Sequence, residues 1–98
     1  MKSHIDLSLT LEADQDIVGI LQYTRETYGE TQAGRYERDL NRAFNRLRSF
    51  PEIGRRSSED GSEREVVVRH HIVVYRLFPQ SLIVLRVVHV RQGSRRTT

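Results

Sequence analysis

The sequence predicts a single α+β domain over residues 1–98, in which a helix hairpin packs on a small, mainly antiparallel sheet in the order β-α-α-β-β-β. Two observations lead to this fold class. Residues 11–28 and 31–49 carry apolar side chains at helical spacing, and the short link between them forces an antiparallel hairpin. Residues 66–91 are rich in valine, isoleucine and leucine and are broken by short turns, which is typical of an antiparallel meander.

The chain begins with a predicted strand and helix. In residues 5–10 apolar and polar side chains alternate, which indicates a short, half-buried strand near a sheet edge. Thr10 is a suitable N-cap because its hydroxyl can accept a bond from a free backbone N–H, and Gly29 is a natural C-terminal stop. The first helix is therefore expected over residues 11–28. Its predicted apolar stripe consists of Ile17, Ile20, Leu21, Thr24 and Tyr28.

The second helix is expected to begin with Thr31 as its cap and to end before Pro51, because a proline disfavours helical backbone in the preceding residue. Four arginines form a stripe beside its apolar face, at Arg35, Arg38, Arg42 and Arg46. The stripe is either a ridge that binds phosphates or carboxylates, or an ordinary solvated face, and we favour the solvated face because such faces are common. The apolar face itself consists of Ala33, Tyr36, Leu40, Ala43, Phe44 and Leu47.

The second half of the chain is predicted to form a loop and three strands. Residues 51–65 are charged and rich in turn formers, which predicts a loop with Ile53 as its one anchor to the core. One strand opens at Val66, and another follows over residues 72–78 after a bend at residues 69–71.

The last strand, residues 82–91, has aliphatic side chains at nearly every position. This pattern predicts a strand that is buried on both faces and central in its sheet. The strand would deliver Arg91 to one end of the molecule, followed by a basic tail, residues 92–98, that is expected to be flexible and that carries Arg95 and Arg96.

The basic residues are almost all of one kind. Of 16 basic residues, 15 are arginine and only Lys2 is lysine. Arginine binds phosphates and carboxylates through two parallel hydrogen bonds, so this choice indicates either a partner rich in such groups or a compositional bias of the genome. The absence of cysteine excludes disulfides, and no apolar run is long enough to cross a membrane. With no signal peptide at the N-terminus, we expect a cytoplasmic protein.

No residue pattern predicts a cofactor, a metal site or a nucleophile. The four histidines are His4, His70, His71 and His89, and no carboxylate or cysteine completes a ligand spacing around them. They are interpreted as structural or surface histidines. The serines of residues 57–62 lie in the predicted loop and not in the sharp turn that activates a nucleophile.

The order of several short segments resembles a known family. These segments are Tyr23 and Tyr28 in the first helix, Phe50-Pro51-Glu52-Ile53-Gly54-Arg55, Arg64, Ile72-Val73-Val74-Tyr75-Arg76, and Leu85-Arg86-Val87-Val88-His89-Val90-Arg91. Together they resemble the ParE branch of the RelE/ParE superfamily, the toxins of bacterial type II toxin–antitoxin modules. The likeness runs from about Ile5 to Gln92.

This resemblance implies a toxin that inhibits DNA gyrase without being an enzyme and forms a hetero-oligomer with a co-encoded antitoxin. No direct, specific nucleic-acid binding is expected. The RelE branch instead cleaves ribosome-bound mRNA. One of its arginines corresponds to Arg91 here, but another falls at Ile72, and its C-terminal tyrosine has no counterpart. We therefore favour the ParE interpretation. A ribosome-dependent endoribonuclease, or a decayed toxin that acts only with its antitoxin in transcriptional regulation, are the alternatives.

Two sets of site residues are predicted. The target is expected to contact Arg91, Arg95, Arg96 and Arg76. The antitoxin is expected to lay an amphipathic segment along an apolar groove beside the helix hairpin, with Tyr28 and Tyr36 at the rim and Leu40 in contact.

Overall fold

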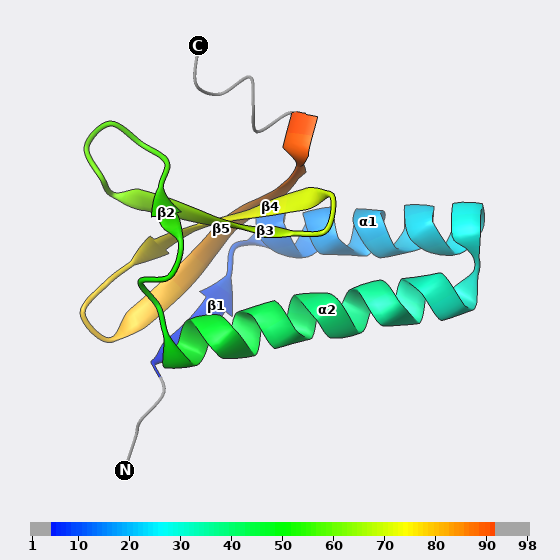
Figure 1. Cartoon of the computed structure of the whole chain (residues 1–98), viewed down its shortest axis with the longest axis horizontal. Helices are drawn as coiled ribbons and strands as arrows, with labels where there is room; N and C mark the ends of the chain where they lie inside the picture. Colours follow the sequence, from blue (N-terminus) through cyan, green and yellow to red (C-terminus); the bar gives the residue numbers. More distant parts are fainter. Residues whose placement is uncertain (1–4, 92–98) are drawn as a thin grey trace.

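The fold is known from a computed structural model, which describes residues 5–91. Two antiparallel helices cover one face of a five-stranded sheet, so the predicted α+β class is confirmed (Figure 1). The sheet has the strand order β1-β5-β4-β3-β2. Along the chain the elements are β1 (Asp6–Leu9), α1 (Leu11–Tyr28), α2 (Glu30–Ser49), β2 (Arg55–Arg56), β3 (Glu63–Val68), β4 (His71–Leu77) and β5 (Ser81–His89).

One capping residue determines where the first helix of the hairpin begins, and one glycine determines where the chain turns into the second. Thr10 caps α1 as predicted: its Oγ1 accepts a hydrogen bond from the Ala13 N–H at 3.0 Å. Gly29 ends α1 and also precedes α2, with a φ of 100° that favours glycine. The predicted cap at Thr31 is wrong, because α2 begins one residue earlier, at Glu30, directly after this turn.

Three of the four strand pairs are antiparallel, and β1 is parallel to β5. The helix hairpin is the crossover that allows the parallel pair. The last strand is interior, as predicted, but β4 is the central strand. β5 also ends at His89, two residues earlier than predicted, and Val90 and Arg91 have helical backbone.

The prediction that the last strand is buried on both faces is wrong, because the helices cover only one face of the sheet (Figure 1). Leu82, Val84 and Val87 are buried under the helices, whereas Arg86 is exposed. The register shifts at Leu85, so that Tyr75 pairs with Val84 and Val74 with Arg86. This bulge moves the buried positions from even to odd numbers.

Helix α1 closes the edge of β5 beyond the end of β1. The Asp16 carboxylate accepts a hydrogen bond from the Val87 N–H at 2.9 Å and two from the Arg86 guanidinium at 2.8 and 3.1 Å. Burial alone would raise the pKa of Asp16, but these bonds outweigh it and lower the pKa below 3.8. The Thr10 hydroxyl donates to the Leu85 carbonyl at 2.8 Å. These contacts occupy backbone groups that would otherwise form an open sheet edge.

The predicted loop at residues 51–65 contains strand β2 and the start of β3. Its predicted anchor, Ile53, is 47% exposed. The anchor is instead Gly54, which is buried against the Tyr75 ring. The Tyr75 hydroxyl donates to the Pro51 carbonyl at 2.7 Å and accepts from the Gly54 N–H at 3.0 Å.

The core lies between the hairpin and the covered face of the sheet. Its largest fully buried side chains are Tyr75, Leu40, Leu47, Leu82, Val73 and Val84. In the part of the chain that the structure describes, neither helix combines the length and the apolar character needed to cross a bilayer.

Candidate functional site

The predicted target-binding arginines lie at two different ends of the sheet. Arg91 follows β5, at the end where His89 pairs with His71. Arg76 pairs with Ile83 near the opposite end of β4, roughly 17 Å along the strand from His71. The structure therefore does not bring Arg76 and Arg91 together. Arg95 and Arg96 lie outside the described residues.

The two arginines also differ in how they are presented. Arg91 is exposed, and its backbone N–H donates to Nδ1 of His89 at 3.2 Å. Arg76 is half-buried: its Nη2 donates to Ser62 Oγ at 3.1 Å, and its Nε is buried without a hydrogen-bond partner. Of the two, only Arg91 presents its side chain freely to a partner protein.

Two of the three predicted antitoxin contacts belong to the core. Tyr36 is 5% exposed and Leu40 is 2% exposed, because the apolar face of α2 packs on the sheet. The placement of Tyr36 at a rim is therefore wrong, and Leu40 is not accessible at the surface. Tyr28 is 64% exposed and therefore accessible, and its contact with the antitoxin stays a prediction.

A hollow of about 390 Å³ lies where the closed end of the helix hairpin faces the turn between β3 and β4. We call it the hairpin pocket. Tyr23 and Tyr28 stand at its mouth, 62% and 64% exposed, and two exposed aromatic rings at a concave site are typical of a protein-binding surface. The lining residues are Tyr23, Thr24, Tyr28, Gln32, Tyr36, Arg69, His70, His71 and His89.

A row of three rings forms the floor of the hairpin pocket. The centroids of Tyr36 and His71 are 5.5 Å apart and those of His71 and His89 are 5.3 Å apart, both pairs edge to face. The Tyr36 hydroxyl bonds to the Val68 carbonyl at 3.2 Å and to Nδ1 of His71. Both bonds are satisfied if Nδ1–H of His71 donates to the hydroxyl and the hydroxyl donates to Val68.

Two of the three rings, Tyr36 and His71, are uncharged at neutral pH. Burial lowers the pKa of His71 to about 4, with a further contribution from the positive charges that His89 and His70 can carry. Burial also raises the pKa of Tyr36 above 10.0, so the hydroxyl keeps its proton. Within residues 5–91 no three histidine, aspartate or glutamate side chains are placed to hold a metal ion. The arrangement is suited to receiving an apolar or aromatic side chain.

Sequence reasoning missed Arg69, which fixes one wall of this pocket. Arg69 has a φ of 56°, as the first residue of a tight two-residue turn, and its guanidinium lies 5.4 Å from the Tyr36 ring centroid. It also forms an ion pair with Asp39 of α2. The only sequence signal was the bend predicted at residues 69–71, and nothing local indicated the contact with α2.

Comparisons with known proteins agree with the fold. Residues 7–96 match the family model described as the ParE toxin of the type II toxin–antitoxin system parDE. A comparison with curated protein sequences finds no match. Among solved structures, the chain is similar to one described as a chromosomal ParDE toxin–antitoxin system from P. aeruginosa, with a TM-score of 0.75 and 18% sequence identity. That match covers 88% of this chain and 96% of the other.

Proposed function

The chain belongs to the ParE toxin family of type II toxin–antitoxin systems, and on this premise we propose that it inhibits DNA gyrase and is held inactive by a co-encoded antitoxin. The family match over residues 7–96 carries this proposal. The chain acts by binding its target and not by catalysis. Both partners are cytoplasmic, and the resting form is a hetero-oligomer of toxin and antitoxin.

Arg91 is the proposed centre of the target contact. It is exposed and lies just beyond the strand that forms part of the hairpin pocket. Arg95 and Arg96 remain predicted contacts from the sequence. Arg76 fits this role less well, because it is half-buried at the other end of β4 and bonded to Ser62.

The antitoxin is proposed to place an amphipathic segment in the hairpin pocket, between Tyr23 and Tyr28 and above Tyr36. His89 lines this pocket, and Arg91 is bonded to His89 through its backbone. A segment bound there would therefore cover the Arg91 end of the molecule. Neutralisation then follows from direct occlusion of the target-binding residue, without a change of shape in the toxin.

Induction of the isolated chain in bacteria, with and without the neighbouring reading frame, tests the function. Expected results are filamentous cells, an induced DNA-damage response and rescue by co-expression. The purified chain should also block DNA supercoiling by gyrase. Intact DNA with rapid loss of mRNA would instead identify a ribosome-dependent ribonuclease, and growth unaffected by the chain would identify a decayed toxin.

Matched variants separate the two surfaces. Arg91→Ala should abolish growth inhibition, whereas Arg35→Ala, an exposed arginine of α2, should leave it unchanged. Tyr28→Ala should keep growth inhibition but weaken rescue by the neighbouring gene product.

A further inference from the structure

The outer side of α2 carries a row of arginines that the core does not use. Arg38, Arg42 and Arg46 are exposed and follow one another in steps of four, and Arg35 stands one turn before them. At about 100° per residue these side chains fall within about 80° of the helix surface, on the side turned away from the core. Steps of four residues rise about 6 Å, so the row from Arg38 to Arg46 is about 12 Å long. We call Arg38, Arg42 and Arg46 the arginine ridge.

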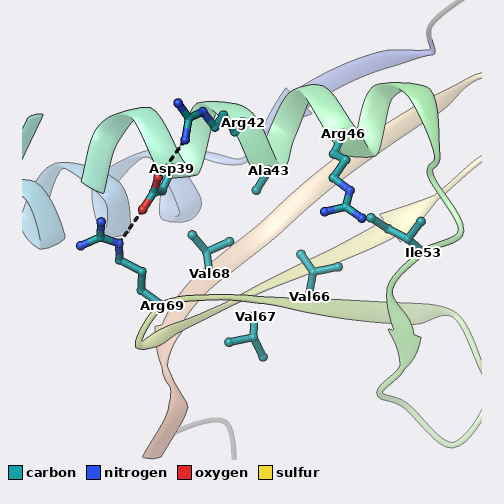
Figure 2. Close-up of a pocket in the computed structure, with 9 residues that line it drawn as sticks. All are labelled: Asp39, Arg42, Ala43, Arg46, Ile53, Val66, Val67, Val68 and Arg69. Carbon is teal, nitrogen blue, oxygen red and sulfur yellow. Dashed lines mark hydrogen bonds and ion pairs between the residues drawn. The ribbon is translucent and has the colours of Figure 1, made fainter. Parts of the chain in front are cut away.

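Few carboxylates lie beside the arginine ridge. Asp39 is next to it on the helix surface, but Asp39 already forms an ion pair with Arg69 and lies 3.7 Å from Arg42 (Figure 2). Glu37 projects from the opposite flank of α2, roughly 140° from the centre of the ridge. Within residues 5–91, neither of the other two ridge arginines forms an ion pair. One carboxylate therefore serves two arginines, and the ridge keeps a net positive charge.

The surroundings of the ridge are polar. Asn41 and Asn45 are exposed on its flank. Oδ1 of Asn45 accepts a hydrogen bond from Arg48 at 2.7 Å, which leaves the amide N–H groups of Asn45 to donate elsewhere. Figure 2 shows Arg42 reaching away from the sheet edge and Arg46 reaching along it toward Ile53. Helix α2, all of which the structure describes, exposes no large apolar or aromatic side chain.

This composition discriminates between the kinds of partner that bind arginine. A tight protein interface has aromatic or apolar anchors at its centre, and single-stranded nucleic acids stack their bases on aromatic rings. The ridge offers neither. It offers a straight row of charged donors, which suits phosphates and holds a duplex without reading its sequence. The phosphates of one strand rise by about 3.4 Å each, so the ridge runs beside about four of them.

We propose that the arginine ridge binds the phosphate backbone of duplex DNA, irrespective of its sequence. The choice of DNA over duplex RNA rests on the proposed function, because gyrase acts on DNA and a toxin held on DNA meets it there. Frequency alone favours a solvated face for a stripe of this kind, but the scarcity of carboxylates and of apolar side chains around it favours binding. The ridge lies on α2 and Arg91 beyond β5, so the two contacts use different elements.

Fluorescence anisotropy of a labelled duplex, titrated with the purified full chain, tests the ridge. We expect a dissociation constant of about 1–100 µM near physiological salt for two unrelated duplexes of about 20 base pairs. Between about 50 and 200 mM salt, the logarithm of the binding constant should fall with a slope of about −3, one phosphate for each ridge arginine. A slope near zero, equal binding of single-stranded DNA, or tighter binding of duplex RNA would overturn the proposal.

Paired variants separate the ridge from net charge. The double variant Arg38→Gln and Arg46→Gln removes two ridge charges that have no ion-pair partner in the described chain, and should weaken binding about tenfold and reduce the salt slope by about 2. The control is Arg25→Gln with Arg56→Gln, which removes two exposed charges from α1 and β2. It should change the affinity by less than about threefold and leave the slope unchanged. Equal losses in both variants would show that only net charge matters and would overturn the ridge.

The failure of this proposal is distinguishable from the failure of the proposed function. The titration contains no gyrase, so a chain that blocks supercoiling but does not bind the duplex would overturn the ridge alone. A chain that binds the duplex through the ridge but leaves supercoiling by gyrase unchanged would contradict the proposed function and support the ridge.

Discussion

Gly54→Ala should strongly destabilise this protein. A Cβ at this position would lie 2.5 Å from the Tyr75 hydroxyl, 2.8 Å from Tyr75 Cε1 and 2.9 Å from the Glu65 carbonyl oxygen. The carbonyl belongs to strand β3, which cannot yield without disturbing its pairing with β4. The buried Tyr75 ring cannot yield either without leaving its place in the core.

The size of the effect follows from two contributions. Overpacking of a buried site costs about 1–3 kcal/mol. Movement of Tyr75 also weakens the bonds of its hydroxyl to Pro51 and Gly54, each worth about 1 kcal/mol. The free energy of unfolding should therefore fall by about 2–4 kcal/mol, a large part of the stability of a small domain.

Urea denaturation followed by circular dichroism measures this change. Gly19→Ala is the matched control: nothing lies within 4 Å of its added Cβ, and it should stabilise α1 by roughly 0.5–1 kcal/mol. Adding Tyr75→Phe to Gly54→Ala removes the closest clash, so the losses of the two single variants should not add. A loss below about 0.5 kcal/mol for Gly54→Ala would refute the anchoring of residues 51–54 by Tyr75.

Three further outcomes are expected. Arg91→Ala should abolish growth inhibition while changing the free energy of unfolding by less than about 0.5 kcal/mol, as for other exposed sites; a larger loss in urea denaturation would identify a structural residue. Val87→Ala should lower the free energy of unfolding by about 1–3 kcal/mol by leaving a cavity under α1, and an unchanged urea midpoint would contradict its place in the core. The folded-state pKa of His71, about 4, lies below the value of 6.5 for the free side chain, so the unfolded chain binds more protons and stability should fall as pH drops from 7 toward 4. The size of the pKa shift corresponds to a loss of about 3 kcal/mol in the free energy of unfolding, and the solvent contact of His71 reduces this to roughly 1–2 kcal/mol. His71→Phe should flatten the pH profile of stability above pH 4.5, where Asp16 with its lowered pKa does not yet contribute. An equally steep profile in this variant would refute the assignment to His71.

Local signals predicted the helices well. The cap at Thr10 and the stop at Gly29 depend only on residues close by in the sequence, and the bounds of α1 agree with them. Strand β2 was missed because two arginines carry no periodicity, and only the pairing with Arg64 and Glu65 makes them a strand. The sequence also does not predict the parallel pairing of β1 with β5. This pairing depends on the edge of the sheet at which the chain re-enters after the helix hairpin.

The candidate site was predicted less well, for an identifiable reason. Tyr36 and Leu40 lie on the apolar face of the second helix, which the sequence predicts to pack on the sheet, so the same pattern argues against an accessible role for them. The row Tyr36, His71 and His89 joins three elements far apart in the chain. No spacing in the sequence encodes such a contact, and the hairpin pocket became visible only when the fold was known.

The parallel pair of β1 and β5 also bears on the order of folding. Leu7 pairs with Leu82, so the first strand of the sheet has no neighbour until the last strand has been made. Contacts between such distant segments close a long loop and form late. During synthesis the helix hairpin is made before β5, the strand that pairs with β1. The surface around Arg91, where the target contact is proposed, then exists only after the whole sheet has closed.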